Sequence, residues 1–452
     1  MSGNDPSLHD HDASVADVAA PMAREMWTSA TTRVVHSFDR AVAMIELWTR
    51  RTFGRRRRDL RDRWRVAGAN ALIHVLQALS FRSVRGSGAH PDRIVVYTAG
   101  ILGDNVVLLP AIRALRRRYP SARLAVMVNV QENDSSGARG LFRMTPWIDE
   151  LRIVTDRVVV RRGIRVRFDE PALVGMECDL FVNLSPFGKR GWLGAVFREL
   201  LIARRLGAER AVGFRLHSWN RRDYAPSQML DIPNEGRRAA EVLETLGLRV
   251  PLRDHGLALD SCGDIDRVLE FAGIREGEGF VVLHPGAALL IKQWPAERFG
   301  AVAAWIHSTS GHRALITGTA QESELCSRVA AAAAGSAVSI AGQTTVTGLA
   351  QLLARSALCV CNDTGTMHLA AALGTPLVAI FSTRVSPTWW YPNADRHAVV
   401  FRMLPCSGCR KDTVEGCGHE CMLHISVEDV KRAVSRVEWA GPRRAQAVQV
   451  RR

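Results

Sequence analysis

The chain has 452 residues, of which 47% are apolar, and its formal net charge is +15 at pH 7. This length can bury two or three cores, so a single small domain is excluded. This excess of positive charge favours acidic substrates, an anionic membrane surface or nucleic acid as partners. A basic surface that is simply solvated explains the same net charge.

No export signal or membrane helix is predicted. The chain begins MSGNDPSLHDHD, which is acidic and polar where a signal peptide is basic and then apolar. The longest apolar candidate, residues 94–112, is interrupted by Gly100, Gly103, Asp104 and Pro110, so a strand, a loop and a helix start explain it better. We therefore expect a cytoplasmic protein with reduced cysteines.

Residues 1–90 are predicted to form an N-terminal extension with a disordered start and, over residues 15–85, two or three helices. Residues 50–65 hold nine arginines, flanked by apolar patches at 41–48 and 71–79. Two hypotheses stay open. This basic amphipathic region lies on the anionic inner face of the inner membrane, or it packs on the main body with its arginines in solvent.

After the extension, strand-like apolar runs alternate with helical patterns, which predicts α/β architecture with parallel sheets. The predicted strands are 93–98, 124–129, 151–154 and 180–184, then 280–284, 313–317, 338–341, 358–361 and 377–381. They indicate two domains, 91–255 and 256–440, followed by a basic tail at 441–452. In such domains, ligands bind at the carboxyl ends of the strands.

The segment VCNDTGTMHLAAALG, residues 360–374, predicts a strand that runs into a helix. Asp363 or Thr364 can cap this helix, and Gly365 leaves its first turn uncrowded. The free N–H groups and dipole at the helix start attract phosphate, and His368 lies near enough to reach the same ligand. An ordinary strand–turn–helix junction explains the same residues, so both interpretations stay open.

A loop with two glycines, YTAGILGDN, ends the first predicted strand. The spacing of Gly100 and Gly103 departs from G-x-G-x-x-G, so it gives little support for a dinucleotide site. Asp104 has a position that suits a general base facing a cleft. Local sequence favours the simpler interpretation that Asp104 caps the following helix.

Two further strand ends carry polar side chains. After the strand that ends at HPG, including Gly286, Lys292 precedes a predicted helix, where a lysine can neutralise a diphosphate. We expect Trp294 to pack this helix onto the sheet. Glu322 follows the segment ITGT and can bind ribose hydroxyls, or it can simply favour the dipole at a helix start.

Four cysteines lie close together near the end of the second predicted domain. Their spacing is C-x2-C-x7-C-x3-C, formed by Cys406, Cys409, Cys417 and Cys421. This spacing predicts a thiolate site for structural zinc or iron, with a redox-active or unliganded loop as the alternative. The remaining five are expected to be buried small apolar residues: Cys178, Cys262, Cys326, Cys359 and Cys361.

Taken together, these motifs resemble glycosyltransferase family 9, the ADP-heptose lipopolysaccharide heptosyltransferases and their relatives. The matching segments are IVVYTAGILGDNVVLLPAIRALRRRYP, VVLHPGAALLIKQWPAERF, ALITGTAQE, AGQTTVTGLAQLLARSALCVCNDTGTMHLAAALGTPLVAIF and CMLHISVEDV. They occur in family order over residues 93–433, which leaves residues 1–90 uncovered.

The resemblance implies a GT-B fold, with two Rossmann-like domains facing a cleft, the acceptor domain first and the nucleotide-sugar domain second. It implies inverting, single-displacement transfer without a required cofactor. Asp104 matches the proposed general base, and Gly103 and Gly286 match positions where backbone approaches the substrates. The implied donor-binding residues are Lys292 at the phosphates, Glu322 at the ribose, Thr344 near adenine, and Asp363, Thr364, Gly365 and His368 at the donor-binding turn.

Two departures bear on function. Ala287 and Ala288 stand where relatives commonly carry Ser or Thr beside the phosphates. The cysteine spacing is similar at its ends to the iron-binding finger of autotransporter heptosyltransferases, although its middle spacing differs.

Three functional hypotheses follow. The first is transfer of a heptose-like sugar from an ADP-sugar to a cell-envelope glycolipid, such as lipopolysaccharide core. The second keeps the donor but uses a protein serine or threonine as acceptor, with the four cysteines as a metal finger. The third is a non-catalytic, membrane-associated scaffold that binds nucleotide-sugars. No nucleic-acid partner is expected.

Overall fold

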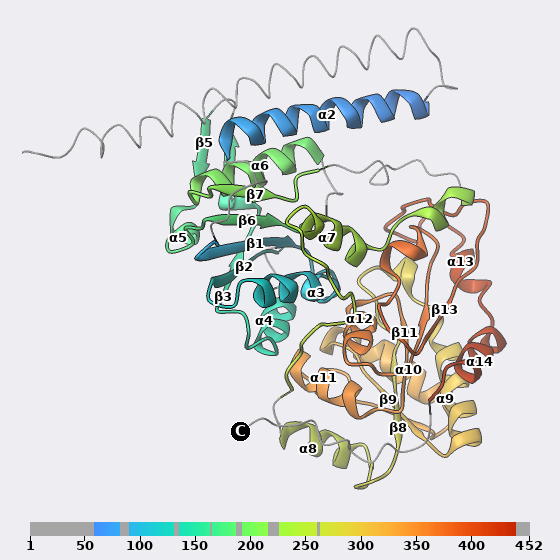
Figure 1. Cartoon of the computed structure of the whole chain (residues 1–452). Helices are drawn as coiled ribbons and strands as arrows, with labels where there is room; N and C mark the ends of the chain where they lie inside the picture. The colour runs from blue at the N-terminus through green and yellow to red at the C-terminus, as the bar shows by residue number, and fades with distance from the viewer. Residues whose placement is uncertain are drawn as a thin grey trace, which may run out of the picture.

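The computed structural model describes residues 58–81, 90–130, 135–162, 165–186, 192–215, 226–259 and 263–439. It contains two α/β domains, each built around a parallel sheet, with one long helix lying over the outer side of the first domain (Figure 1). The predicted disordered start, the basic tail and Cys262 lie outside the described residues.

The N-terminal domain has a five-stranded parallel sheet in the order β3-β2-β1-β6-β7. Its strands are β1 (Arg93–Ala99), β2 (Arg123–Asn129), β3 (Glu150–Val154), β6 (Leu180–Asn183) and β7 (Arg210–Val212). A small antiparallel hairpin, β4 (Val159–Arg162) and β5 (Arg165–Phe168), follows β3. The helices are α2 (Arg58–Ser80), α3 (Leu102–Arg118), α4 (Ser135–Arg143), α5 (Glu170–Leu173), α6 (Trp192–Arg205) and α7 (Glu235–Glu244).

Alternate residues of the central strand β1 pack against helices on opposite faces of the sheet. Ile94 and Val96 belong to the core shared with α3 and α4, whereas Val95 and Tyr97 belong to the core shared with α2 and α6. This two-residue period follows from the geometry of an extended strand. Because helices cover both faces of the sheet, the sequence of the strand is one continuous apolar run.

The C-terminal domain has a six-stranded parallel sheet in the order β10-β9-β8-β11-β12-β13. Its strands are β8 (Phe280–His284), β9 (Arg313–Ile316), β10 (Ala337–Ser339), β11 (Leu358–Asn362), β12 (Leu377–Ile380) and β13 (His397–Val400). Its helices are α8 (Gly263–Phe271), α9 (Ala296–Ser310), α10 (Ser323–Ala332), α11 (Val346–Arg355), α12 (Gly365–Ala372), α13 (Glu420–Leu423) and α14 (Val427–Arg436).

The two domains meet through helices that cover the inner faces of their sheets. α12 packs against α3, and α11 packs against α4, so the two inner faces share one apolar cluster. A second junction involves α7, where Arg238, 1% exposed, forms an ion pair with Glu235 and donates to the Leu184 carbonyl at 2.6 Å. The indole N–H of Trp389, from the C-terminal domain, donates to Glu235 at 3.1 Å. This buried network ties the two domains together.

Trp294 packs as the sequence predicts. Its side chain is 1% exposed, meets Phe299 edge-on at 5.2 Å, and donates its indole N–H to the Ile425 carbonyl at 2.9 Å. Cys178, Cys326, Cys359 and Cys361 are buried free thiols, as expected. None of the described helices is long and apolar enough to cross a bilayer.

Candidate active site

The first turns of α3 and α12 meet at the junction of the two domains, because both carry glycine at the contact. A Cβ atom built on Gly103 would lie 3.2 Å from the Gly365 Cα atom and 2.9 Å from the His368 ring. Only a residue without a side chain allows this approach. The contact brings two helix N-termini, one from each domain, to the same place.

We expect Gly103→Ala to lower turnover about tenfold, because the added methyl group forces α3 and α12 apart and overpacking a tight contact costs about 1–3 kcal/mol. His368 is buried, so its ring has little room to move aside. The measurement is kcat alongside the urea midpoint. Gly68→Ala on α2, where a Cβ atom would meet nothing within 4 Å and the backbone is not left-handed, controls for the substitution. Equal turnover by Gly103→Ala and wild type would contradict this prediction.

Asp104 closes the first turn of the helix on which it lies. Its carboxylate accepts the Ile101 backbone N–H at 2.8 Å. The preceding loop is tight, since Gly100 has φ of 119° and a Cβ atom there would lie 2.2 Å from the Asp104 carboxylate oxygen. Asn105 completes the loop by donating to the Ile101 carbonyl at 2.9 Å. The N-cap residue of α3 is therefore Ile101, and Asp104 closes the first turn from the third position of the helix instead of capping it as the N-cap aspartate expected from sequence. This bond holds the carboxylate beside the domain junction.

Lys292 and Asp363 form an ion pair, with the lysine Nζ atom 2.6 Å from the carboxylate. Lys292 closes a short 3-10 turn, η5 (Leu290–Lys292), after β8, and Asp363 follows β11. Asn362 joins these loops by donating its amide to the Pro285 carbonyl at 2.6 Å and accepting the Trp294 N–H at 3.2 Å. The structure thus brings Lys292 to the start of α12.

Thr364, and not Asp363, caps α12. The Thr364 hydroxyl accepts the Thr366 backbone N–H at 3.2 Å, while the Asp363 carboxylate faces Lys292. The helix therefore keeps a polar cap and still presents its N-terminal N–H groups beside a lysine ammonium. This combination of a helix start and a cation suits a phosphate group.

Glu322 lies against Gly286, where two neighbouring strand ends meet. A Cβ atom built on Gly286 would lie 2.1 Å from a Glu322 carboxylate oxygen. The Glu322 carboxylate also accepts the Thr319 backbone N–H at 2.8 Å and so closes the turn that leads into α10. This contact agrees with the interpretation of Glu322 as a helix-start residue. The next strand end carries Thr344, whose loop contacts the loop of Glu322 through Gly342. These three loops follow β8, β9 and β10 in turn.

His368 is buried in the site and uncharged at neutral pH. Burial lowers the pKa of His368 to about 4. The Asp363 carboxylate has a smaller effect that raises this pKa, and the Lys292 ammonium has a smaller effect that lowers it further. Burial also lowers the pKa of His255 to about 4, and this histidine lies close enough to His368 to interact with it electrostatically. Neutral imidazole can offer one donor and one acceptor to a ligand.

We expect the free energy of unfolding to fall as pH drops from about 6.5 to about 4. Both histidines have lower pKa values folded than unfolded, so protonation in this window favours the unfolded chain. Each histidine contributes on the order of 3 kcal/mol at most. Urea unfolding at several pH values should show a shallower loss for His368→Gln than for wild type. His74→Gln, which changes an exposed histidine, should keep the wild-type slope.

Two tryptophans border the site without having been predicted there. Trp390 meets the His368 ring edge-on at 6.0 Å and stacks on Trp389 at 5.8 Å. Both belong to a 3-10 turn, η7 (Pro387–Trp390). Two adjacent tryptophans are unusual in a chain with 6% aromatic residues, and this pair was the sequence feature that could have indicated them as site residues.

The four-cysteine loop contacts the loop of Lys292. His419, between the third and fourth cysteines, donates from Nε2 to the Ile291 carbonyl at 3.1 Å. Cys406 and Cys409 are exposed, and burial raises the pKa of Cys421. Among the described residues, no three His, Cys, Asp or Glu side chains converge to hold a metal ion. The metal site predicted from the cysteine spacing stays a prediction, and the other three thiols lie within electrostatic reach of Cys421.

Comparisons with known proteins agree with this architecture. The family profile described as "Glycosyltransferase family 9 (heptosyltransferase)" matches residues 239–418. Lipopolysaccharide heptosyltransferase 3 of Escherichia coli is 24% identical over 296 residues, which cover 64% of this chain and 83% of that protein. The chain is therefore similar to glycosyltransferase family 9 over residues 239–418 and to heptosyltransferases over most of their length. The predicted family resemblance is confirmed, and the similar proteins indicate a glycosyltransferase.

Two solved structures share its fold. The family 9 glycosyltransferase of Veillonella parvula has a TM-score of 0.55 at 19% identity, over 76% of this chain and 96% of that one. The E. coli ADP-heptose LPS heptosyltransferase II has a TM-score of 0.53 at 20% identity, over 76% and 97%. The predicted GT-B fold is therefore confirmed.

Proposed function

We propose that this protein is a family 9 glycosyltransferase that moves a heptose-like sugar from an ADP-sugar to a cell-envelope glycolipid, with inversion at the anomeric carbon. One observation carries the proposal. Lys292 and the start of α12 lie together in the C-terminal domain, and Asp104 lies across the domain junction beside Gly103. The names of the relatives, lipopolysaccharide heptosyltransferase 3 and ADP-heptose LPS heptosyltransferase II, support the choice of donor and acceptor.

In this proposal the C-terminal domain binds the donor. The diphosphate lies at the start of α12 beside Lys292, and Glu322 accepts hydrogen bonds from the ribose hydroxyls. Thr344 lies near the adenine, and Gly286 lets the backbone approach the ligand closely. As the bond from the sugar to the diphosphate breaks, negative charge grows on the leaving group. A helix start and an ammonium group fixed beforehand stabilise that charge.

The N-terminal domain binds the acceptor in this proposal. Asp104 takes the proton of the acceptor hydroxyl as its oxygen bonds to the anomeric carbon, opposite the departing ADP. One displacement inverts the configuration, and no cofactor is required. We also place the enzyme in the cytoplasm, a reducing compartment that suits the free thiols.

The test begins with a panel of nucleotide-sugars. ADP-heptose should raise the melting temperature more than UDP- or GDP-sugars, because a ligand that binds only the native state stabilises it. Products made with a glycolipid acceptor should gain one heptose by mass, and NMR should show the inverted anomer. Preference for another nucleotide, or retention of configuration, would contradict the respective part of the proposal. Donor binding without hydrolysis or transfer would favour the scaffold hypothesis.

A second candidate acceptor is a protein serine or threonine, with a structural zinc or iron ion held by Cys406, Cys409, Cys417 and Cys421. The donor set is right for either ion, although binding would require the exposed thiols to move together. The His419 contact to Ile291 would then brace the loop of Lys292. Elemental analysis should find about one ion per chain, lost in Cys406→Ser/Cys409→Ser and kept in Cys178→Ser. Mass spectrometry of protein and lipid fractions separates the two acceptors.

A further inference from the structure

The buried histidine of the site, His368, has an aromatic neighbour that the proposed mechanism does not use. This histidine is 5% exposed. One contact of its ring is with the start of α3, where a Cβ atom built on Gly103 would lie 2.9 Å away. Another is with Trp390, which meets the imidazole edge-on, with the ring centroids 6.0 Å apart and the ring planes at 69°. Because Gly103 has no side chain, Trp390 is the neighbour whose side chain can set the orientation of the imidazole.

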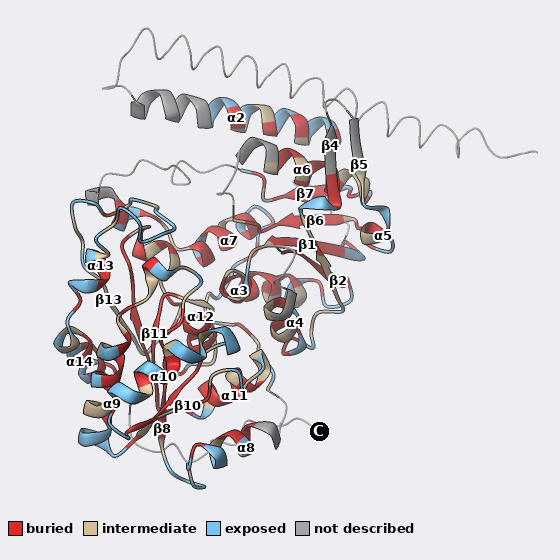
Figure 2. Cartoon of the chain, turned by 180° about the vertical axis from the view of Figure 1, so that it is seen from behind, coloured by how far each residue is buried: buried red, intermediate tan, exposed pale blue. Residues whose placement is uncertain are grey.

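Bonds to the N-terminal domain fix the turn that carries Trp390. Trp390 stacks on Trp389, which precedes it in η7, with the ring centroids 5.8 Å apart. The indole N–H of Trp389 donates to Glu235 of α7 at 3.1 Å, and the Thr388 hydroxyl donates to the Ile232 carbonyl at 2.8 Å. α7 lies where the two domains meet, and most of its residues are buried (Figure 2). The indole ring of Trp390 therefore has a fixed place beside His368.

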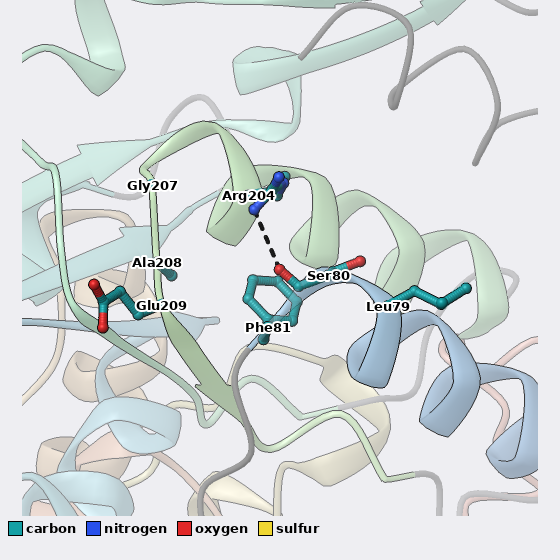
Figure 3. Close-up of a pocket in the computed structure, with 7 residues that line it drawn as sticks. All are labelled: Leu79, Ser80, Phe81, Arg204, Gly207, Ala208 and Glu209. Atoms are coloured by element: carbon teal, nitrogen blue, oxygen red, sulfur yellow. Dashed lines mark hydrogen bonds between the residues drawn. The ribbon is translucent and has the colours of Figure 1, made fainter. Parts of the chain in front are cut away.

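A hollow elsewhere on the N-terminal domain lies away from this contact. It has a volume of about 300 Å³ and lies between the end of α2 and the turn after α6 (Figure 3). Arg204, which lines it, donates to the Ser80 carbonyl at 3.2 Å. α2 covers the outer side of the domain, whereas α12 lies at the junction with the other domain (Figure 1). The hollow is thus separate from the donor site, and the contact between Trp390 and His368 belongs to it.

Covering by Trp390 affects both the charge and the orientation of His368. Burial is the main cause that lowers the pKa of His368 to about 4. The titratable side chains that act on it are Asp363, which raises this pKa, and Lys292 and His255, which lower it. The residue that α3 places against the ring is a glycine and carries no charge. If a small side chain replaced Trp390, water would reach the imidazole and its pKa would rise toward the ordinary value of 6.5.

We propose that Trp390 is a positioning residue for the donor site, whose indole ring fixes the orientation of the His368 imidazole and screens it from water. This role rests on the proposed function, since it takes His368 as a side chain that meets the donor. Trp390 acts through His368. Because η7 is bonded to the N-terminal domain, the shape of the donor site then depends on how the two domains meet.

The experiment compares the full chain with three variants of one position, by calorimetry with ADP at pH 7.5 and pH 5.5. Trp390→Ala and Trp390→Leu should bind ADP about tenfold more weakly than wild type at pH 7.5, whereas Trp390→Phe keeps an aromatic edge and should stay within about threefold. At pH 5.5 the loss in Trp390→Ala should be smaller, because the uncovered imidazole gains a proton and attracts the diphosphate. Each variant is compared with wild type at the same pH, so the titration of ADP itself cancels. Trp390→Leu, which fills more of the space, guards against an alanine variant that fails to fold.

An NMR titration of the imidazole in the free enzyme tests the contact without ADP, with His368→Gln identifying the signal. The pKa of His368 should rise from about 4 toward 6.5 in Trp390→Ala and stay near the wild-type value in Trp390→Phe. The matched control is Trp439→Ala. It removes the same kind of edge contact, between Trp439 and His312 at 5.5 Å, outside the site, and should bind ADP as wild type does.

Wild-type ADP affinity in Trp390→Ala and Trp390→Leu, with an unchanged titration of His368, would overturn the positioning role. A tenfold loss of affinity in Trp390→Phe with an unchanged titration would also overturn it, because the indole would then act on the donor directly. If wild type binds no ADP, the proposed donor site fails. The titration of His368 in Trp390→Ala then still decides whether the indole screens the imidazole.

Discussion

Asp104→Asn is expected to lower turnover about 100-fold or more while leaving the start of α3 intact. The asparagine carbonyl can accept the Ile101 N–H that the carboxylate now accepts at 2.8 Å. What the variant loses is the proton acceptor, and a positioned general base contributes typically 10²–10⁴ in rate. The measurement is kcat at saturating donor and acceptor, with donor affinity determined separately by calorimetry.

The matched control is Asp429→Asn on α14. Asp429 caps its own helix in the same way, accepting the Ser426 N–H at 2.9 Å, but it lies outside the site. Turnover per folded enzyme should therefore match wild type. Asp104→Ala should lose the cap as well as the base, so it should be less stable than Asp104→Asn. Turnover of Asp104→Asn within about threefold of wild type would leave Asp104 with the capping role alone.

The buried strands were predictable because a parallel strand covered on both faces is a continuous apolar run. Phe280–His284 is observed at the predicted bounds, and the other predicted strands agree within one or two residues at each end. The missed strands are β7 and β13 at sheet edges and the hairpin β4–β5, which contains four arginines. Short or charged edge strands carry little hydrophobic pattern, so composition could not reveal them.

The site was predictable where one local pattern suffices and unpredictable where distant segments meet. The sequence allowed Asp363 or Thr364 as the cap, since both residue types cap helices. The choice depends on Lys292, which draws the Asp363 carboxylate to 2.6 Å from a distant position in the chain. Likewise, nothing local to His368 indicates Trp390 or the contact with Gly103. The cysteine spacing indicated a metal ligand set but could not place the four thiols.

Lys292→Met is expected to weaken ADP binding about 100-fold or more, and also to destabilise the free enzyme. Hydrogen bonds to charged groups contribute about 1.5–3 kcal/mol, and the unpaired Asp363 would in addition repel the diphosphate. Loss of the ion pair should cost about 2 kcal/mol of stability, less than for a fully buried pair because Lys292 is 17% exposed. Calorimetry with ADP and urea unfolding measure the two effects.

The double variant Lys292→Met/Asp363→Asn separates the two roles of the lysine. Removing the uncompensated carboxylate should restore much of the lost stability, but ADP affinity should stay low because the phosphates still lack their cation. Lys431→Met on α14, where the lysine pairs with Glu428 at 2.8 Å, should leave ADP affinity unchanged. If the double variant binds ADP as wild type does, Lys292 acts only by neutralising Asp363. The start of α12 alone would then hold the diphosphate, as its dipole and free N–H groups allow.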